Sequence, residues 1–221
     1  LDRHVANGRG DHPALVYMNE RGERRTFSYA ALLDLVERIA ASLRALGIGK
    51  GDRLTIYMPT SPEAIALMLA TVRIGALHSV VFAGFGANAL GGRISASGSR
   101  LVFAADVTFR KGKEVDLKTI VDDALATCGD SVEHLIVLER GAQPRSLSSP
   151  RDLTWTEFLA RGDGYSSTHA VMESNDAAFI LATSGTTARP KLAVHTHGGY
   201  QVHIASMGRW CFGLKPSDVW W

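Results

Sequence analysis

The sequence has 221 residues, of which 46% are hydrophobic and 21% charged, a composition that is ordinary for a globular protein with a sizeable core. Its 24 basic and 22 acidic residues give a formal net charge of +2, so there is no electrostatic case for nucleic acid as a partner. Cys128 and Cys211 lie far apart in no metal-ligand spacing, which favours a reducing compartment over a disulfide framework. No uncharged apolar run is long enough to span a bilayer and no signal-peptide pattern opens the chain, so we expect a cytoplasmic protein with no membrane partner.

The predicted elements alternate between strands and helices along most of the chain. Short apolar or alternating segments are typical of strands, and they occupy residues 13–18, 24–29, 52–58, 77–83, 100–105, 133–138, 176–183 and 191–197. Apolar residues at helical spacing predict helices at residues 29–46, 61–75, 87–97, 116–129 and 199–213. Residues 139–152 are rich in Pro, Ser and Arg, which is typical of a surface loop.

Start and stop signals support several of these helices. Ser28 and Ser61 are typical N-cap residues, and Gly47 and Gly75 are typical residues just past a helix end. Residues 154–157 read TWTE, which has the Thr-x-x-Glu spacing of a capping box before a short helix. Strands separated by helices of this length imply an α/β fold, with a parallel-dominated sheet and helices on both of its faces.

The strand predicted at 176–183 leads directly into the sequence TSGTTARPK at 183–191. In parallel α/β sheets ligands gather at the carboxyl ends of strands, and successive N–H groups of a Gly/Ser/Thr turn can converge on an anion. Lys191 adds a full positive charge, and hydroxyl donors come from Thr183, Ser184, Thr186 and Thr187. Neither the Walker pattern nor G-x-G-x-x-G is present. Two interpretations remain open on composition alone: a phosphate-binding loop, or a polar hairpin that binds nothing.

A resemblance to a known family bears on this choice. The sequence TSGTTARPKLAVHTHGGY at 183–200 resembles the signature of the AMP-forming adenylating enzymes, which runs Thr-Ser-Gly-[Ser/Thr]-Thr-Gly-x-Pro-Lys-Gly. This family contains the acyl-CoA synthetases, the luciferases and the adenylation domains of peptide synthetases. The sequence IYMPTSPEAIALMLATVRIGALHSVVFAGF at 56–85 and the ending HTHGGY narrow the resemblance to the acetyl- and propionyl-CoA synthetase branch. RLVFAAD at 100–106 and VDDAL at 121–125 fit as well, so the resemblance covers nearly the whole chain in order.

The resemblance implies a two-step reaction. A carboxylate and ATP give an acyl-adenylate and pyrophosphate, and the thiol of CoA then displaces AMP to form the thioester. It implies that the loop wraps the β- and γ-phosphates of ATP in the first step, with Lys191 as the catalytic cation. The remaining ATP-binding positions that it implies are Thr183, Ser184, Gly185, Thr186, Thr187, Ala188 and Arg189. The ammonium, hydroxyl and N–H donors would stabilise the charge that develops on the departing pyrophosphate.

Mg²⁺ is expected with ATP, although the sequence offers no protein ligand for it. The strand predicted at 191–197 places His195 and His197 on one face, and His203 follows them. No further Cys or carboxylate ligand accompanies these histidines, so we predict no metal site in this chain.

A second binding surface lies in the sequence ADVTFRKGKEVDLK at 105–118, between a predicted strand and a predicted helix. In the acetyl-CoA synthetase branch, two arginines at this spacing bind the nucleotide phosphate of CoA. Arg110 matches the first, and Lys113 stands where the second would be, which keeps a cation without the bidentate fork of arginine. The resemblance also assigns Phe82, Ala83 and Gly84 to the CoA surface. The alternative interpretation of 105–118 is a solvated basic loop.

The chain departs from the family pattern at two positions of the loop. Ala188 and Leu192 stand where the family has glycine. If position 188 needs a positive φ, alanine costs about 1 kcal/mol or more relative to glycine. Both residues keep their backbone N–H, so we expect a working loop. The alternative is a non-catalytic homologue, an interaction module that retains the fold only.

The domain organisation follows from the ends of the chain and from the resemblance. The chain begins at Leu1 rather than Met and ends at Trp221, inside the apolar sequence DVWW. We therefore expect 1–221 to be a partial N-terminal ATP- and CoA-binding domain, truncated at both ends, from a synthetase about three times longer. The C-terminal domain would be absent, and the remainder of the polypeptide would be a partner of this chain. Alone, the chain is expected to be inactive, and it does not reveal which carboxylate is the substrate.

Overall fold

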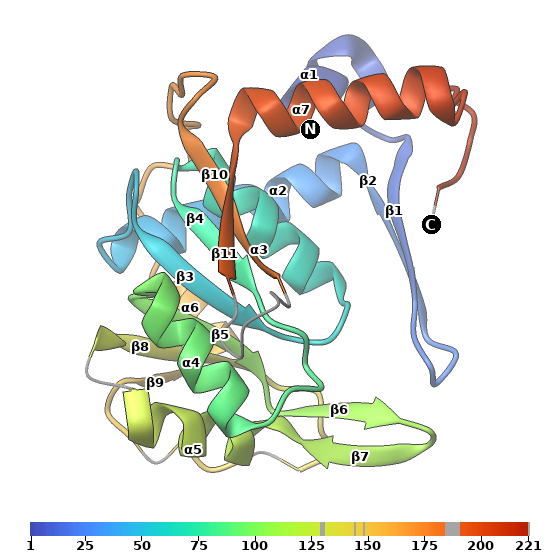
Figure 1. Ribbon diagram of the computed structural model, residues 1–221. Coiled ribbons are helices and arrows are strands. Elements are labelled where there is room, and N and C mark those ends of the chain that lie inside the picture. Colours follow the sequence, from blue (N-terminus) through green and yellow to red (C-terminus); the bar gives the residue numbers. More distant parts are fainter. Residues whose placement is uncertain (129–130, 144, 148, 184–190, 221) are drawn as a thin grey trace.

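The computed structural model describes residues 1–128, 131–143, 145–147, 149–183 and 191–220. Within these residues the chain forms a central seven-stranded sheet with the strand order β11-β10-β4-β3-β5-β8-β9 (Figure 1). The strands are β3 (Arg53–Tyr57), β4 (Leu77–Val80), β5 (Leu101–Ala105), β8 (His134–Leu138), β9 (Asp152–Thr154), β10 (Ala177–Thr183) and β11 (Lys191–Thr196). Neighbouring strands are parallel except for β10 and β11, which are antiparallel. The predicted α/β fold with a parallel-dominated sheet is confirmed.

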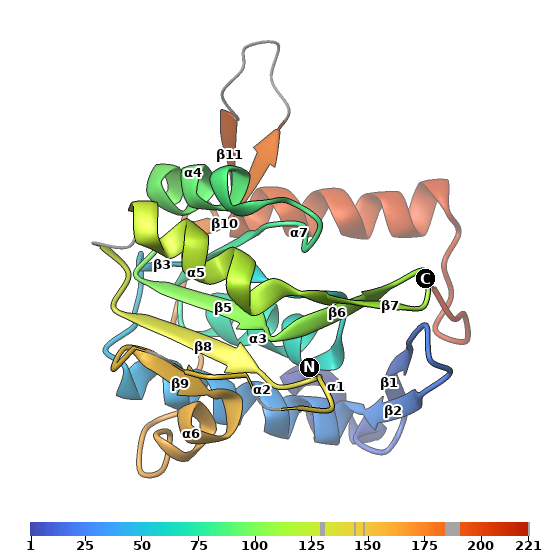
Figure 2. The same cartoon turned by 90° about the horizontal axis from the view of Figure 1, so that it is seen from below.

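Helices cover both faces of this sheet, as Figure 2 shows. They are α2 (Tyr29–Ala45), α3 (Pro62–Arg73) and α6 (Trp155–Ala160) on one face, and α4 (Ala87–Ser97) and α5 (Leu117–Cys128) on the other. Each face has its own core, and the strands divide their residues between the two. Leu101 and Phe103 of β5 pack into the core of α2, α3 and α6, whereas Val102 and Ala104 pack into the core of α4 and α5. Because alternate residues of a strand point to opposite faces, a strand buried on both sides is a continuous apolar run.

The helix boundaries follow the caps that the sequence predicts. The hydroxyl oxygens of Ser28 and Ser61 each accept a hydrogen bond of 3.2 Å, from the N–H groups of Ala31 and Ala64. Gly47 and Gly75, just past α2 and α3, have φ angles of +71° and +77°, which glycine adopts without a steric penalty. Thr154 and Glu157 form the predicted capping box at the start of α6.

Among the described residues, two antiparallel hairpins lie outside the main sheet. They are formed by β1 (Pro13–Met18) with β2 (Arg24–Ser28), and by β6 (Val107–Arg110) with β7 (Lys113–Asp116). The second hairpin is a correction, because the sequence predicted only a connection there. Its turn consists of Lys111 and Gly112, with φ angles of +51° and +76°, as a two-residue hairpin turn of type I′ requires. Both hairpins project on the same side of the sheet, beyond the carboxyl ends of the parallel strands (Figures 1 and 2).

Smaller corrections concern element limits. Strand β4 ends at Val80 rather than at residue 83, so Phe82, Ala83 and Gly84 belong to the loop that follows it. The short strand β9 begins at Asp152, inside the segment expected to be a loop. Helix α7 (His197–Ser206) starts two residues earlier than predicted, with the Thr196 hydroxyl as its cap. His197 is therefore helical and does not share a strand face with His195.

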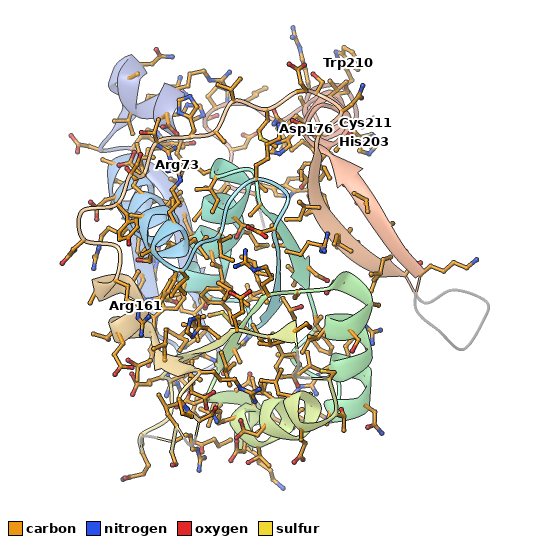
Figure 3. All side chains as sticks on the ribbon, turned by 90° about the vertical axis from the view of Figure 1, so that its left-hand side faces the viewer. Arg73, Arg161, Asp176, His203, Trp210 and Cys211 are labelled. Carbon is orange, nitrogen blue, oxygen red and sulfur yellow. The ribbon has the colours of Figure 1, made fainter. Side chains whose placement is uncertain are left out.

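The N-terminal end of the described chain is helical, and a helical segment also precedes the irregular residues 212–220. The N-terminal residues form α1 (Asp2–His4) and η1 (Val5–Arg9), and α7 continues into η3 (Met207–Cys211). His203, Trp210 and Cys211, which are labelled in Figure 3, belong to this C-terminal segment. Trp210 is 76% exposed there. Among the helices of the described residues, none combines the length and the apolar character needed to cross a membrane.

Candidate functional site

Residues that the family resemblance assigned to CoA lie close together at the carboxyl edge of the sheet. The guanidinium carbon of Arg110, at the end of β6, lies 5.2 Å from the centre of the Phe82 ring in the loop after β4. Lys113 is the cross-strand partner of Arg110 on β7. A Cβ atom on Gly84 would come within 3.0 Å of the Arg110 Nη2 atom and would collide with the Phe82 ring. Glycine is therefore the residue that allows Phe82 and Arg110 to approach each other here.

Further residues extend this contact into a larger group that sequence reasoning missed. The Phe85 ring lies edge-on to the Phe82 ring at 6.0 Å, and the Arg93 guanidinium lies 4.3 Å from the Phe85 ring centre. We call Phe82, Phe85, Arg93 and Arg110 the arginine–aromatic cluster. The Phe82 side chain is 60% exposed and Phe85 is 38% exposed. Exposed aromatic faces beside guanidinium groups are suited to a ligand that carries both a flat ring and negative charge.

A cleft of about 550 Å³ opens beside the cluster. Its walls come from the β1–β2 hairpin, the ends of β3 and β4, strand β6 and strand β10, and they include Tyr17, Thr60, Phe82, Arg110 and Leu181. This volume lies within the range of small-molecule sites. The cleft runs between the cluster and β10, the strand that leads into the predicted phosphate loop.

The predicted phosphate loop begins and ends on described residues. Thr183 is the last residue of β10 and Lys191 the first of β11; the two are register partners. The Thr183 hydroxyl donates a 3.2 Å hydrogen bond to the Lys191 carbonyl oxygen. The loop therefore joins two strands and follows the carboxyl end of β10, as expected. Its inner positions, Ser184, Gly185, Thr186, Thr187, Ala188 and Arg189, lie outside the described residues, and their role stays a prediction.

A buried carboxylate holds the β6–β7 hairpin against the sheet. Asp106 is 1% exposed and lies between β5 and β6. Its Oδ1 atom accepts hydrogen bonds of 2.7 Å from the N–H groups of Val107 and Arg140, and its Oδ2 atom accepts one of 3.1 Å from Gly141. The Asp106 carbonyl oxygen accepts from the N–H of Leu117 at 2.9 Å. A buried carboxylate with this many donors has a fixed position, so Asp106 ties the hairpin to the ends of β5 and β8.

Strand β4, which lies next to β10 in the sheet, contains a buried histidine. His78 of β4 pairs with Phe179 of β10, and their rings stack at 5.4 Å. Burial lowers the pKa of His78 to about 4, so the imidazole is neutral at physiological pH.

In the described part of the chain, no group of three or more His, Cys, Asp or Glu side chains is placed to hold a metal ion.

Nucleotides commonly bind at the carboxyl edge of a mostly parallel α/β sheet, and a glycine- and hydroxyl-rich segment after a strand is suited to phosphate. The chain belongs to the AMP-binding enzyme family, whose model matches residues 2–221. Over its full length it is 43% identical to an acetyl-coenzyme A synthetase from Streptomyces avermitilis and 42% identical to a 3-hydroxypropionyl-coenzyme A synthetase from Metallosphaera sedula. In each case it covers 34% of the relative. The resemblance to the acetyl-CoA synthetase branch is confirmed.

A solved structure supports the same conclusion. The acetoacetyl-CoA synthetase from Streptomyces lividans superposes with a TM-score of 0.87 at 27% sequence identity, over 97% of this chain and 32% of that chain. The chain thus spans about a third of the length of the relatives that it matches.

Proposed function

We propose that this chain carries the ATP phosphate loop and part of the CoA surface of an AMP-forming acid–CoA ligase. The overall reaction would convert a carboxylate, ATP and CoA into acyl-CoA, AMP and diphosphate. The observation that carries the proposal is the contact of Arg110 with Phe82 beside Gly84, in a chain 43% identical to an acetyl-CoA synthetase. The remainder of the polypeptide would supply the other parts of the site, and the protein would act in the cytoplasm.

In the first step, Lys191 would act on the phosphates of ATP. Lys191 is the first residue of β11, directly after the loop, and from there its ammonium group would reach the β- and γ-phosphates. The negative charge on the departing pyrophosphate grows as the carboxylate attacks the α-phosphorus. A fixed cation therefore stabilises the transition state more than bound ATP. Mg²⁺ would arrive as part of the Mg·ATP substrate rather than on a carboxylate cluster of this chain.

In the second step, the β6–β7 hairpin would hold CoA. Arg110 and Lys113 offer two adjacent cations to its nucleotide phosphate, and the exposed face of Phe82 offers a surface for the flat base. Lys113 is a compact charge without the planar fork of arginine, so Arg110 would supply the more directional contact. Neither residue takes part in adenylation, because CoA enters after pyrophosphate has formed.

The test is ATP–pyrophosphate exchange by the full-length protein with a panel of short carboxylates, followed by a thioester assay with CoA. We expect exchange without CoA for at least one acid, and thioester formation once CoA is added. A protein inactive with every acid, and not rescued by Ala188→Gly, would be a non-catalytic homologue that retains the fold only. Exchange without any thioester formation would support the proposed ATP loop and contradict the proposed CoA surface.

A further inference from the structure

A buried tyrosine lies directly beneath the arginine–aromatic cluster. Tyr57 is the last residue of β3, and its side chain is 0% exposed. It packs in the core of α4 and α5 together with Val81 and Ala83, which flank Phe82 in the loop after β4. Its hydroxyl donates a 2.6 Å hydrogen bond to the Phe85 carbonyl oxygen. Tyr57 thus links the end of β3 to the loop after the neighbouring strand.

The bonded carbonyl belongs to the turn that presents the cluster. The Phe85 N–H donates 3.0 Å to the Phe82 carbonyl oxygen, which closes a tight turn over residues 82–85. Gly84 lies inside this turn and has no space for a side chain, because the Phe82 ring and the Arg110 guanidinium lie against it. A shift of the turn would therefore move Phe82 relative to Arg110.

Arg110 also lies close enough to act on the tyrosine itself. Burial raises the pKa of Tyr57, and the positive charge of Arg110 acts in the opposite direction. The Tyr57 hydroxyl is thus bonded to the Phe85 carbonyl group and is also influenced by the charge of Arg110. It has no exposed surface of its own, so CoA bound at the cluster would not contact it.

We infer that Tyr57 is a positioning residue of the CoA surface: its hydroxyl fixes the turn 82–85 and thereby holds Phe82 against Arg110. The inference rests on the function proposed above. It adds a residue that acts through the turn rather than on the ligand. The alternative role is purely structural, in which the hydroxyl only satisfies the Phe85 carbonyl group and adds stability.

The experiment is Tyr57→Phe in the full-length protein. Loss of the hydroxyl leaves a partly buried carbonyl oxygen without its donor, and we expect the KM for CoA to rise about threefold to tenfold. Because Arg110 would contact the nucleotide phosphate, the preference for CoA over dephospho-CoA should fall by a similar factor. ATP–pyrophosphate exchange without CoA should keep its wild-type rate and KM for ATP. An unchanged KM for CoA and an unchanged preference would overturn the inference.

Thr55→Val is the matched control. Thr55 lies two residues earlier on β3, so it points to the same face of the sheet, and it is also 0% exposed. Its hydroxyl is 2.9 Å from the Ser99 hydroxyl, away from the turn 82–85. Both variants remove one buried hydroxyl and should lower Tm by similar amounts. Only Tyr57→Phe should change the KM for CoA; equal changes in both variants would mean that the effect is one of stability.

Arg110→Ala, measured in the same assay, separates the inference from the proposal on which it rests. If Arg110→Ala raises the KM for CoA and Tyr57→Phe does not, the CoA surface stands and the role of Tyr57 is rejected. If neither variant changes the KM for CoA, the proposed CoA surface itself is wrong.

Discussion

Two antiparallel hairpins present cations at the carboxyl edge of the sheet, and they differ in how they are supported. The β6–β7 hairpin has a two-residue turn, and the buried carboxylate of Asp106 anchors it at its base. Arg145 supports it further along, through a 2.6 Å ion pair with Glu114. Its Arg110 rests on the Phe82 ring. The hairpin that carries this cation is therefore held by several contacts within the described chain.

In the described part of the sheet, the β10–β11 hairpin pairs with another strand on one side only. Strand β10 lies between β4 and β11, but in the described part of the sheet β11 pairs with β10 alone. Lys191, at the start of this edge strand, is exposed. The difference fits the two proposed tasks. The β6–β7 hairpin would offer CoA a preformed surface, and such a surface costs little ordering entropy when it binds a large ligand. Lys191 on the β10–β11 hairpin would instead take up its position when ATP binds, because its charge acts on the charge that develops in the transition state.

The largest expected effect comes from Lys191→Ala, which removes the ammonium group at the start of β11. We expect the rate of ATP–pyrophosphate exchange to fall about 10²–10³-fold, the range found when one donor to a developing oxyanion is lost. The KM for ATP should rise much less, because the interaction is strongest in the transition state. Lys215→Ala removes an exposed lysine elsewhere and should have no effect. A silent Lys191→Ala in an active protein would show that this hairpin is not the phosphate site.

A second prediction concerns His78 on β4, the strand next to β10. The folded protein keeps His78 of β4 neutral, with its pKa lowered to about 4 by burial, whereas the unfolded chain binds a proton near pH 6.5. The neutral His78 therefore contributes fully to the free energy of unfolding above pH 6.5. As the pH falls toward 4 this contribution is lost, and the free energy of unfolding decreases by up to about 3 kcal/mol.

Urea unfolding between pH 7 and 4 measures this loss. His78→Phe keeps a ring against Phe179 and should have a shallower decline of stability with falling pH than wild type. His203→Gln removes an exposed histidine and should match the wild-type profile. Identical profiles for wild type and His78→Phe would mean that protonation of His78 does not limit the stability of the β4–β10 junction.

The third prediction concerns the supported hairpin. Arg110→Ala should raise the KM for CoA by a factor that corresponds to about 1.5–3 kcal/mol, the cost of losing a charge-assisted contact with phosphate. Exchange without CoA should be unaffected. Lys111→Asn is the control, because it removes the adjacent charge and asparagine tolerates the φ of +51° at that position. If Arg110→Ala slowed exchange as much as thioester formation, the division of tasks between the hairpins would be wrong.

Most of the main sheet could be predicted from the sequence, because its strands are apolar runs between helices with clear caps. The β6–β7 hairpin could not, for a physical reason. Its strands are four residues long, and its turn begins with Lys111 rather than the Asn or Asp that usually precedes glycine in such turns. A short strand pair with charged residues at its tip has the same pattern as a solvated basic loop.

The grouping of residues at the candidate site came from the family resemblance rather than from their spacing in the sequence, and their role in binding CoA stays a prediction. The assignment of Phe82, Gly84 and Arg110 to one surface came from the family, and the structure places them in contact. The contact of Arg93 with Phe85 and the anchoring role of Asp106 leave no periodic signal in the sequence. Contacts of this kind depend on how a loop turns after its strand, and local residue patterns do not determine that.

The smallest expected effect concerns Ala188, which stands where the family has glycine. If the loop needs a positive φ at this position, alanine strains it by about 1 kcal/mol, and Ala188→Gly relieves the strain. The exchange rate should then rise up to about fivefold, since 1.4 kcal/mol corresponds to a factor of ten. Tm should fall slightly, because glycine adds freedom to the unfolded chain.

Leu192→Gly tests the second departure from the family pattern. Compared with Ala188→Gly, it shows whether the φ angle at position 188 or the bulk of the side chain at position 192 limits the loop. Leu192 lies inside β11 opposite Ala182, so glycine there weakens the strand pair without changing a turn. We expect Leu192→Gly to lower Tm more than Ala188→Gly and to leave the exchange rate unchanged or lower it. A faster Leu192→Gly enzyme and an unchanged Ala188→Gly enzyme would mean that the side chain beside Lys191, and not the φ angle at 188, limits how this hairpin acts on ATP.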